Sequence, residues 1–339
     1  MNTDSCQISV IIPIYNNSPL ITLTLNSIVK QSFKGFEIIL VDDGSTDNSI
    51  ELARKVLENT DLKFSIIQQE NSGVSCARNK GLENANGDYI YFLDGDDQVE
   101  PECLESLFLR MVEFEADVVV CSYDVRTSDG KVQRTFDKRF SYSYESISGP
   151  KYAELVLKHK TWACTGTILW RKSFLDKTGV VYTQGAFNGQ DVEFTLKNLS
   201  QASRVSCVDS VLMHYIIYDS SRNSRARWRR FHSVGCYLRL EKFLANNTTN
   251  EQLIKLVSAR AIPLSYIEVI NHLILNGISN EEFFQVIKHP YVVRRISSGN
   301  LRLLGFRKYL LTLVIVRFPR VYYAFFFRRF RKLRKSLAL

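Results

Sequence analysis

Short apolar runs alternate with segments of helical periodicity along the first 122 residues of the chain. The apolar runs predict strands over residues 8–14, 36–41, 64–67, 89–93 and 117–122. The periodic segments predict helices from a cap at Ser18 and Pro19 to about residue 31, from Ser45 or Thr46 past residue 57, and over 74–84 and 101–115. This alternation predicts the α/β class, a mainly parallel sheet with helices on both faces.

Beyond residue 122 the alternation weakens. Residues 123–150 are rich in Ser, Tyr and charge, and Asp129-Gly130 predicts a hairpin within a variable excursion. Later segments predict strands over 165–171 and 211–217, a helix over 192–199 and a helical pattern over 223–289. We therefore expect three parts, namely a first domain over residues 1–222, a helical region over 223–299 and a tail over 300–339.

An acidic cluster, Asp94-Gly95-Asp96-Asp97, ends the predicted strand over residues 89–93. Ligand sites in parallel sheets lie at the carboxyl ends of strands. If the extended conformation persists to Asp96, the two-residue period places Asp94 and Asp96 on one side, where they can share a divalent ion. The alternative is a solvated turn, because Asp-Gly and Asp-Asp are common in turns. A second acidic strand end, Asp42-Asp43, favours the metal site.

Composition narrows the class of protein. The seven cysteines are odd in number and widely spaced, which predicts buried thiols in a reducing compartment. The absence of a Cys-x-x-Cys pair and the scatter of the five histidines argue against a zinc site. The first residues lack a basic and then apolar signal sequence, so we expect a protein that is not secreted.

The net charge of +9 belongs to the tail. Residues 300–339 hold eleven Lys or Arg and no Asp or Glu, which leaves 33 basic and 35 acidic residues before them. We therefore expect no nucleic-acid partner for the protein as a whole.

Apolar runs in the tail are interrupted by Arg317, Pro319 and Arg320. A spanning helix would bury the two arginines at about 2.5 to 3.5 kcal/mol each. Lying on the surface avoids that cost, and basic side chains gain about 1 kcal/mol per charge on anionic lipid. We expect residues 300–339 to bind the inner face of the cell membrane, which makes the protein cytoplasmic and peripheral. The alternatives are a solvated basic tail and a nucleic-acid arm.

Several short stretches resemble, in their order and spacing, a family 2 glycosyltransferase with the GT-A fold. They are Val10-Ile-Ile-Pro13-Ile-Tyr15-Asn16, Val41-Asp42-Asp43-Gly44-Ser45-Thr46-Asp47, Gly73-Val-Ser-Cys-Ala-Arg78-Asn79, Phe92-Leu-Asp94-Gly-Asp96-Asp97 and Gly189-Gln190-Asp191. The resemblance covers about the first 220 residues. It implies an inverting, metal-dependent transfer of sugar from a UDP-sugar.

The resemblance assigns Asp43 to the uracil imino N–H, and it implies further nucleotide-sugar contacts from Pro13, Asn16 and Gly95. Tyr15 can offer its ring to the nucleobase at about 1 to 3 kcal/mol, or it can pack on the next helix. A carboxylate would also suit guanine or thymine, so the choice of UDP rests on the resemblance.

The remaining candidates concern phosphate, metal and chemistry. Arg78 can bind phosphate or ribose in fork geometry, or form an ordinary surface ion pair. By resemblance, Asp96 binds Mg²⁺ or Mn²⁺ directly and Asp94 contacts the ribose or the metal. His214 is a further metal candidate, with a core histidine as the alternative.

Asp191 stands where the family places its general base, which takes the proton of the acceptor hydroxyl. The alternative is an acid that stabilises a helix N-terminus. The family commonly has Glu-Asp here, so Gln190 puts a supporting contact in doubt.

The function that we expect is transfer of a hexose or N-acetylhexosamine to a lipid-linked oligosaccharide, in capsule, exopolysaccharide or cell-wall glycan synthesis. The alternatives are a sugar nucleotidyltransferase, a phosphoacceptor signalling domain and an inactive membrane adaptor that binds nucleotide. A sugar nucleotidyltransferase would usually have a glycine-rich phosphate loop after its first strand, and Pro13-Ile-Tyr-Asn-Asn is not such a loop. The acidic pair follows the second strand, whereas a phosphoacceptor domain has it after the first.

Overall fold

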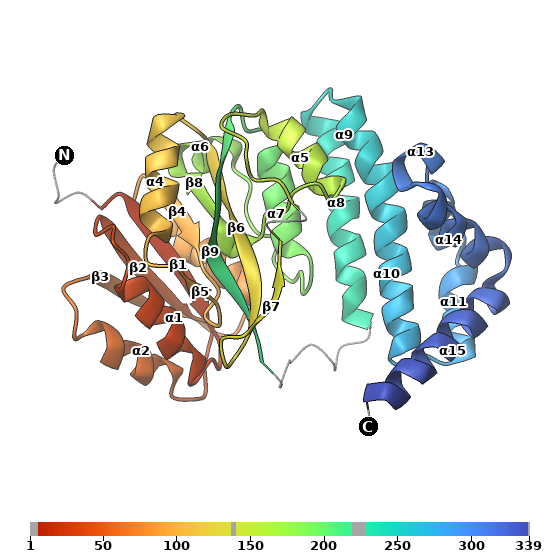
Figure 1. Ribbon diagram of the computed structural model, residues 1–339, viewed down its shortest axis with the longest axis horizontal. Coiled ribbons are helices and arrows are strands. Elements are labelled where there is room, and N and C mark those ends of the chain that lie inside the picture. The colour runs from red at the N-terminus through yellow and green to blue at the C-terminus, as the bar shows by residue number, and fades with distance from the viewer. Residues whose placement is uncertain (1–5, 137–139, 219–227, 338–339) are drawn as a thin grey trace. The chain divides into compact units, whose positions relative to one another are not determined.

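The structure is a computed structural model that describes residues 6–136, 140–218 and 228–337, with side chains as far as residue 328 (Figure 1). The chain folds as two compact units. The first comprises residues 1–186 and 190–221, and the second comprises residues 187–189 and 222–339.

A nine-stranded sheet forms the centre of the first unit (Figure 1). Its strands are β1 Ile8–Ile14, β2 Phe36–Asp42, β3 Lys63–Gln68, β4 Tyr89–Phe92, β5 Gln98–Val99, β6 Val118–Thr127, β7 Val132–Thr135, β8 Ile168–Arg171 and β9 Val205–Ile217. Their order is β3-β2-β1-β4-β8-β6-β9-β5, with β7 beside β6. Strands β1 to β4 are parallel, β8 is antiparallel to both of its neighbours, and β9 runs parallel to β6. The predicted α/β class with a parallel core is confirmed.

Helices cover both faces of the sheet. They are α1 Leu20–Val29, α2 Ser49–Leu57, α3 Val74–Glu83, α4 Cys103–Glu113, α5 Gly149–Leu157, α6 Lys172–Thr178 and α7 Gln190–Leu199. Alternate residues of β1, from Ile8 to Ile14, belong to one buried cluster with α1, α2 and α4. On the other face, Ile11 contacts α3 at Gly81, where an added Cβ would overlap Ile11 Cγ2. Glycine at position 81 therefore sets how closely α3 approaches the sheet.

The first two helices begin later than predicted. Helix α1 begins at Leu20 and α2 at Ser49, and neither receives a side-chain cap. The polar residues before them hold two loops together instead, because Asp47 accepts hydrogen bonds from Ser18 N at 3.1 Å and from Ser49 N at 3.0 Å. The predicted caps at Ser18, Ser45 and Thr46 were wrong. Ser18 contacts the other loop through its backbone N–H, and the hydroxyls of Ser45 and Thr46 form hydrogen bonds with Asn16, contacts that local sequence does not show.

The second half of the unit departs further from the prediction. The hairpin at Asp129-Gly130 is confirmed, because Gly130 N donates to Thr127 O between β6 and β7. Of the strand predicted over 165–171, the first three residues form a 3-10 turn. Strand β9 begins at Val205, six residues before the predicted start. The prediction began too late because the register of β9 with β6 shifts at residues 208–211, which breaks the apolar pattern there.

The regular elements of the second unit, in the part that the structure describes, are all helices. Those of two turns or more are α8 Phe231–Asn247, α10 Ile262–Leu275, α11 Asn280–Lys288, α12 Pro290–Ser297, α14 Phe306–Arg317 and α15 Pro319–Leu337. Shorter turns are η3 Trp228–Arg230, α9 Glu251–Leu256, the π-helical η4 Val257–Ala261 and α13 Leu301–Leu304. Helix α10 packs against α8, α12, α14 and α15. The Tyr322 hydroxyl of α15 donates to Asn271 Oδ1 of α10 at 2.6 Å.

Among the described residues, no single helix is both long enough and apolar enough to cross a membrane. In that part of the chain, α14 taken together with residues 319–328 reaches the length and apolar composition of a span, and this pair is bent by 117°.

Candidate functional site

The acidic cluster after β4 forms a turn. Strand β4 ends at Phe92, and Asp97 N donates to Asp94 O at 3.1 Å. The extended conformation therefore does not persist to Asp96, and the expectation that Asp94 and Asp96 share one strand face was wrong. A side chain at Gly95 would meet Asn17 Nδ2 at 2.5 Å and Pro13 O at 3.2 Å, so glycine lets the turn lie against the end of β1.

Negative charge is concentrated around this turn. Asp97 is buried, its carboxylate accepts a hydrogen bond from Ile216 N at 3.2 Å, and its pKa is raised well above the usual range by burial and by Asp96 and Asp94. The Tyr218 hydroxyl donates to Asp96 O at 3.3 Å, and burial, followed by Asp96, raises the pKa of Tyr218 to about 12. Such a cluster favours a bound cation.

Arg78 is the buried cation beside these acids. It lies on α3, 3% exposed, forms an ion pair with Asp94, and stands 5.1 Å from the ring centroid of Tyr182. Its Nε and Nη1 atoms are buried and have no hydrogen-bond partner among the described residues. Leaving a buried donor unsatisfied costs about 1 to 3 kcal/mol, so the site is suited to an anion that would accept from Arg78.

The next residue of α3, Asn79, holds the chain that leads into α7. Asn79 Nδ2 donates to Tyr182 O and Tyr182 N donates to Asn79 Oδ1, each at 2.9 Å. Farther along, the Thr183 hydroxyl donates to buried Glu193 of α7 at 3.0 Å. These contacts fix the segment that ends at Asp191.

Asp191 lies half-buried in the first turn of α7. Burial raises the pKa of Asp191, Arg78 opposes that rise, and Asp94 adds to it. The three side chains therefore act on one another electrostatically. The neighbouring Gln190 has a buried Oε1 without a partner among the described residues. A carboxyl with a raised pKa beside a fixed guanidinium is suited to proton transfer.

Asp43 anchors the loop before α3. Its buried carboxylate accepts hydrogen bonds from Gln69 Nε2 at 2.8 Å, Ser72 N at 2.8 Å and Gly73 N at 2.9 Å. Gly73 has φ of 89°, a conformation that favours glycine. The contact between Asp43 and a nucleobase stays a prediction, and it would add a fourth hydrogen bond to this carboxylate.

Asn16 joins the loop after β1 to the loop after β2. Its Oδ1 accepts hydrogen bonds from Thr46 N at 2.8 Å and Asp47 N at 3.3 Å, so the side chain joins the β1 and β2 loops. Tyr15, the residue before it, is 44% exposed. The roles predicted for Pro13, Tyr15 and Asn16 toward a nucleotide sugar stay predictions.

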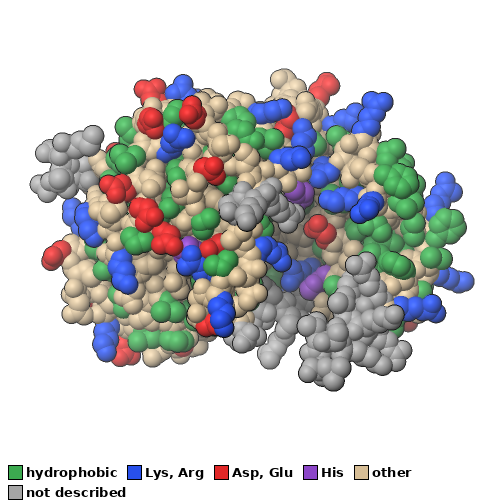
Figure 2. All heavy atoms as spheres, viewed as in Figure 1, with side chains coloured by type: hydrophobic (Ala, Val, Ile, Leu, Met, Phe, Trp, Pro, Cys, Tyr) green, Lys and Arg blue, Asp and Glu red, His purple; other side chains and the backbone are tan. Residues whose placement is uncertain are grey.

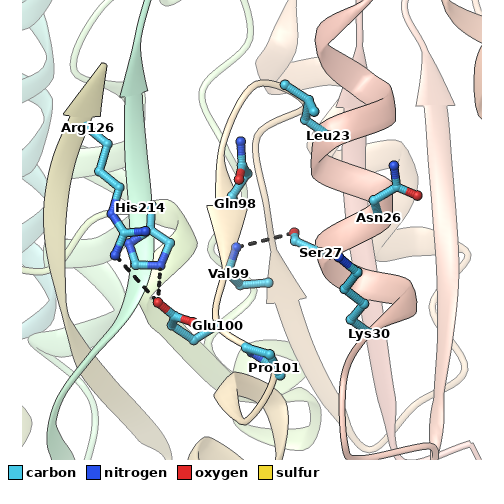
Figure 3. A pocket seen from close by; sticks show the side chains of 10 residues that line it. All are labelled: Leu23, Asn26, Ser27, Lys30, Gln98, Val99, Glu100, Pro101, Arg126 and His214. Carbon is cyan, nitrogen blue, oxygen red and sulfur yellow. Dashed lines mark hydrogen bonds and ion pairs between the residues drawn. The ribbon is translucent and has the colours of Figure 1, made fainter. Parts of the chain in front are cut away.

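His214 faces carboxylates with both ring nitrogens. Nδ1 lies 2.7 Å from Asp124 Oδ1. Nε2 lies 2.8 Å from Glu100 Oε1, and Figure 3 shows this second contact. A metal would have to replace one of these contacts. The metal role of His214 stays a prediction.

No group of three or more His, Cys, Asp or Glu side chains is arranged to hold a metal within the described part of the chain. Mg²⁺ usually takes one or two carboxylates together with substrate phosphates, and Asp94 and Asp96 fit that mode. Sequence reasoning missed Asn79, Tyr182 and Tyr218. Asn79 stands in a quoted stretch beside Arg78 and could have been found, whereas the two tyrosines carry no local signal.

The model of the family "Glycosyl transferase family 2" matches residues 9–179. A protein of Bacillus subtilis strain 168 named as a glycosyltransferase, EpsH, is 29% identical over 84% of this chain and 82% of its own length. The poly(ribitol-phosphate) beta-N-acetylglucosaminyltransferase TarS of Staphylococcus aureus strain Mu50 is 27% identical over 61% of this chain, a match that spans 35% of TarS.

Solved structures share the fold. Residues 1–349 of S. aureus TarS in complex with UDP-GlcNAc superpose with a TM-score of 0.73 at 20% identity, over 97% of this chain and 92% of that one. The mannosyltransferase PcManGT from Pyrobaculum calidifontis in complex with GDP-Man and Mn²⁺ gives a TM-score of 0.55 at 16% identity, over 93% and 88%.

Proposed function

The chain belongs to glycosyl transferase family 2 and has the GT-A fold, and from this premise we propose that it transfers a hexose or N-acetylhexosamine from a UDP-sugar with inversion. The observation that carries the proposal is the pair of unsatisfied donors on buried Arg78, next to the acidic turn. A diphosphate offers acceptors to Arg78 and, together with a cation, balances the charge of Asp94 and Asp96.

In the proposed reaction, Asp191 takes the proton of an acceptor hydroxyl while that oxygen bonds to the anomeric carbon. The bond between that carbon and the diphosphate oxygen breaks, and UDP leaves with the electron pair. A single displacement turns an α-linked donor into a β-glycoside. Arg78 orients the diphosphate, and it also keeps more of Asp191 ionised than burial alone would allow.

Asp96, with Asp94, would hold Mn²⁺ or Mg²⁺. The ion supplies positive charge that stabilises the departing diphosphate. Support for UDP comes from the TarS complex, and from Tyr15 directly after β1 and Asp43 directly after β2. Tyr15 would stack on the base.

The test is binding and turnover of UDP-GlcNAc with Mn²⁺. A ligand at 100 times its dissociation constant adds about 2.7 kcal/mol of stability, which thermal unfolding detects. We expect Asp96→Asn to lose the Mn²⁺-dependent part of this stabilisation, and Asp191→Asn to keep it but lose transfer. Asp88→Asn, an exposed residue just before β4, is the matched control. Full turnover by Asp191→Asn would refute the assigned base, and equal stabilisation of Asp96→Asn would refute the metal site.

We further propose a lipid-linked glycan acceptor, reached at the inner face of the cell membrane through α14 and α15. These helices pack on α10, to which Tyr322 of α15 donates a hydrogen bond, and they also leave apolar side chains exposed to solvent (Figure 2). The exposed set is Phe306, Leu310, Leu313, Phe318, Val321, Phe325 and Phe327.

Basic side chains accompany this apolar set, and residues 300–339 contain no acidic residue. Exposed apolar area rimmed by positive charge is typical of an element that lies in the interface of an anionic membrane. The 117° bend between α14 and α15 supports a surface position over a span.

A further inference from the structure

A cavity of about 360 Å³, with both polar and apolar lining, lies between α1 and β5, on the strand that directly follows the acidic turn (Figure 3). Its walls include Asn26 and Lys30 of α1, Gln98 of β5, and Glu100, Arg126 and His214. The size is at the lower end of the range for small-molecule sites, about 300 to 1,000 Å³. We call it the α1–β5 cavity.

One wall of the cavity is a network of hydrogen bonds and ion pairs. Glu100 Oε1 lies 2.8 Å from His214 Nε2 and 3.5 Å from Arg126 Nη2, and Arg126 Nε donates to Asp124 at 3.0 Å. The two carboxylates are thus already engaged by cationic or ring groups, which leaves them poorly suited to a metal. Ser27, which donates its hydroxyl to Thr24 O, accepts a hydrogen bond from Val99 N at 3.3 Å and fixes α1 to β5 at the floor.

The opposite wall carries polar side chains that are open to a ligand, since Asn26 and Lys30 are exposed to solvent and Gln98 is half-buried. The side chains of Asn26, Lys30 and Gln98 make no hydrogen bond or ion pair with any residue that the structure describes. Leu23, 46% exposed, adds an apolar surface at the rim. Two amides, a carboxylate and a guanidinium around an aliphatic patch match the alternating hydroxyl and C–H faces of a sugar ring.

We propose that the α1–β5 cavity binds a neutral saccharide residue of the acceptor chain, remote from the hydroxyl that reacts. This rests on the proposed function, because a glycan acceptor supplies such a residue. Arg126 is paired with Glu100 and Asp124, and Lys30 is the lining cation without a carboxylate partner among the described residues. A single exposed lysine is too little to select a phosphate over a hydroxylated ring. Gln98 stands two residues after Asp96, so the cavity adjoins the acidic turn along the chain.

The experiment is saturation-transfer NMR and titration of the full chain with a panel of neutral disaccharides, glucuronic acid and inorganic phosphate, in the presence of UDP and Mn²⁺. We expect at least one neutral disaccharide to bind, and the double variant Asn26→Leu with Gln98→Leu to weaken it about tenfold or more, as the loss of two hydrogen bonds predicts. Asn59→Leu, an exposed asparagine outside the lining, should bind as the wild type does.

Two outcomes overturn the proposal. One is binding of no neutral disaccharide, or equal binding by the double variant. The other is phosphate as the preferred ligand, lost in Lys30→Gln, which would make the cavity an anion site. UDP binding is measured on the same samples and tests the proposed function separately. Failure of UDP to bind would count against the proposed function, whereas failure of the disaccharides to bind while UDP still binds would count against the cavity proposal alone.

Discussion

Asn79 and Tyr182 exchange two hydrogen bonds across 103 residues of sequence, side-chain amide to backbone in both directions. Both residues are buried. Because Arg78 lies next to Asn79 on α3, one helix positions the guanidinium and also the chain that leads to Asp191. The proposed phosphate binding and the proposed proton transfer would therefore both depend on the position of α3.

Replacing Asn79 by alanine should destabilise the first unit. Two buried backbone groups of Tyr182 would lose their partners, which lowers the free energy of unfolding by about 2 to 3 kcal/mol. Urea unfolding measures this change. Asn84→Ala is the control, since Asn84 is exposed and its side chain donates only to Lys80 O, and we expect a change within about 0.5 kcal/mol. Equal effects of the two substitutions would contradict the assigned role.

Arg78→Lys should weaken UDP binding although it keeps the charge. Lysine presents a point charge and lacks the planar fork that can satisfy a diphosphate with Nε and Nη1 together. We expect calorimetry with Mn²⁺ to give a dissociation constant about tenfold higher or more. Arg54→Lys, in an exposed pair 3.8 Å from Glu58, should change nothing. Wild-type affinity in Arg78→Lys would show that fork geometry is not used.

The rate should depend on pH through Asp191. Burial raises the pKa of this carboxyl, and a base works only when ionised, so activity should fall on acidification at a higher pH than an ordinary aspartate would give. Arg78→Ala removes a charge that lowers this pKa, and the acidic limb of the profile should move to still higher pH. Arg78→Lys should leave the limb near its wild-type position. The measurement is kcat against pH at saturating donor, and an identical limb in all three proteins would exclude the coupling.

Membrane binding should depend on the exposed face of α14 and α15. Phe318→Ser with Phe325→Ser removes two side chains that are 61% and 57% exposed, and it should reduce sedimentation with vesicles containing anionic lipid by about tenfold or more. High salt should weaken wild-type binding in the same assay. Leu109→Ser, at a 59% exposed leucine of the first unit, is the control. Undiminished binding by the double variant would place the contact elsewhere.

The parallel core was predictable because its strands are continuous apolar runs and its helices repeat every three to four residues. Strand β5 was not predictable, since Gln98–Val99 is too short to show a period and exists only through its pairing with β9. The early start of β9 was hidden by a shift in register that places polar residues inside an apolar run.

Candidate residues that share a short stretch of sequence were found together, as with Asp94 and Asp96. The contacts that arrange them join distant parts of the chain, such as Arg78 with Tyr182 and Asp96 with Tyr218. A tyrosine that packs over a guanidinium has the same sequence signature as any other core aromatic. Geometry of this kind depends on tertiary packing and leaves no local pattern.

A substitution at Gly81 would disturb the candidate site from a distance. A single methyl group there would collide with Ile11 and lever α3 away from the sheet. Arg78 and Asn79 belong to that helix, so both would be displaced although neither residue had been substituted. The positions of Arg78 and Asn79 thus depend on the absence of a side chain at Gly81, a few residues farther along the same helix.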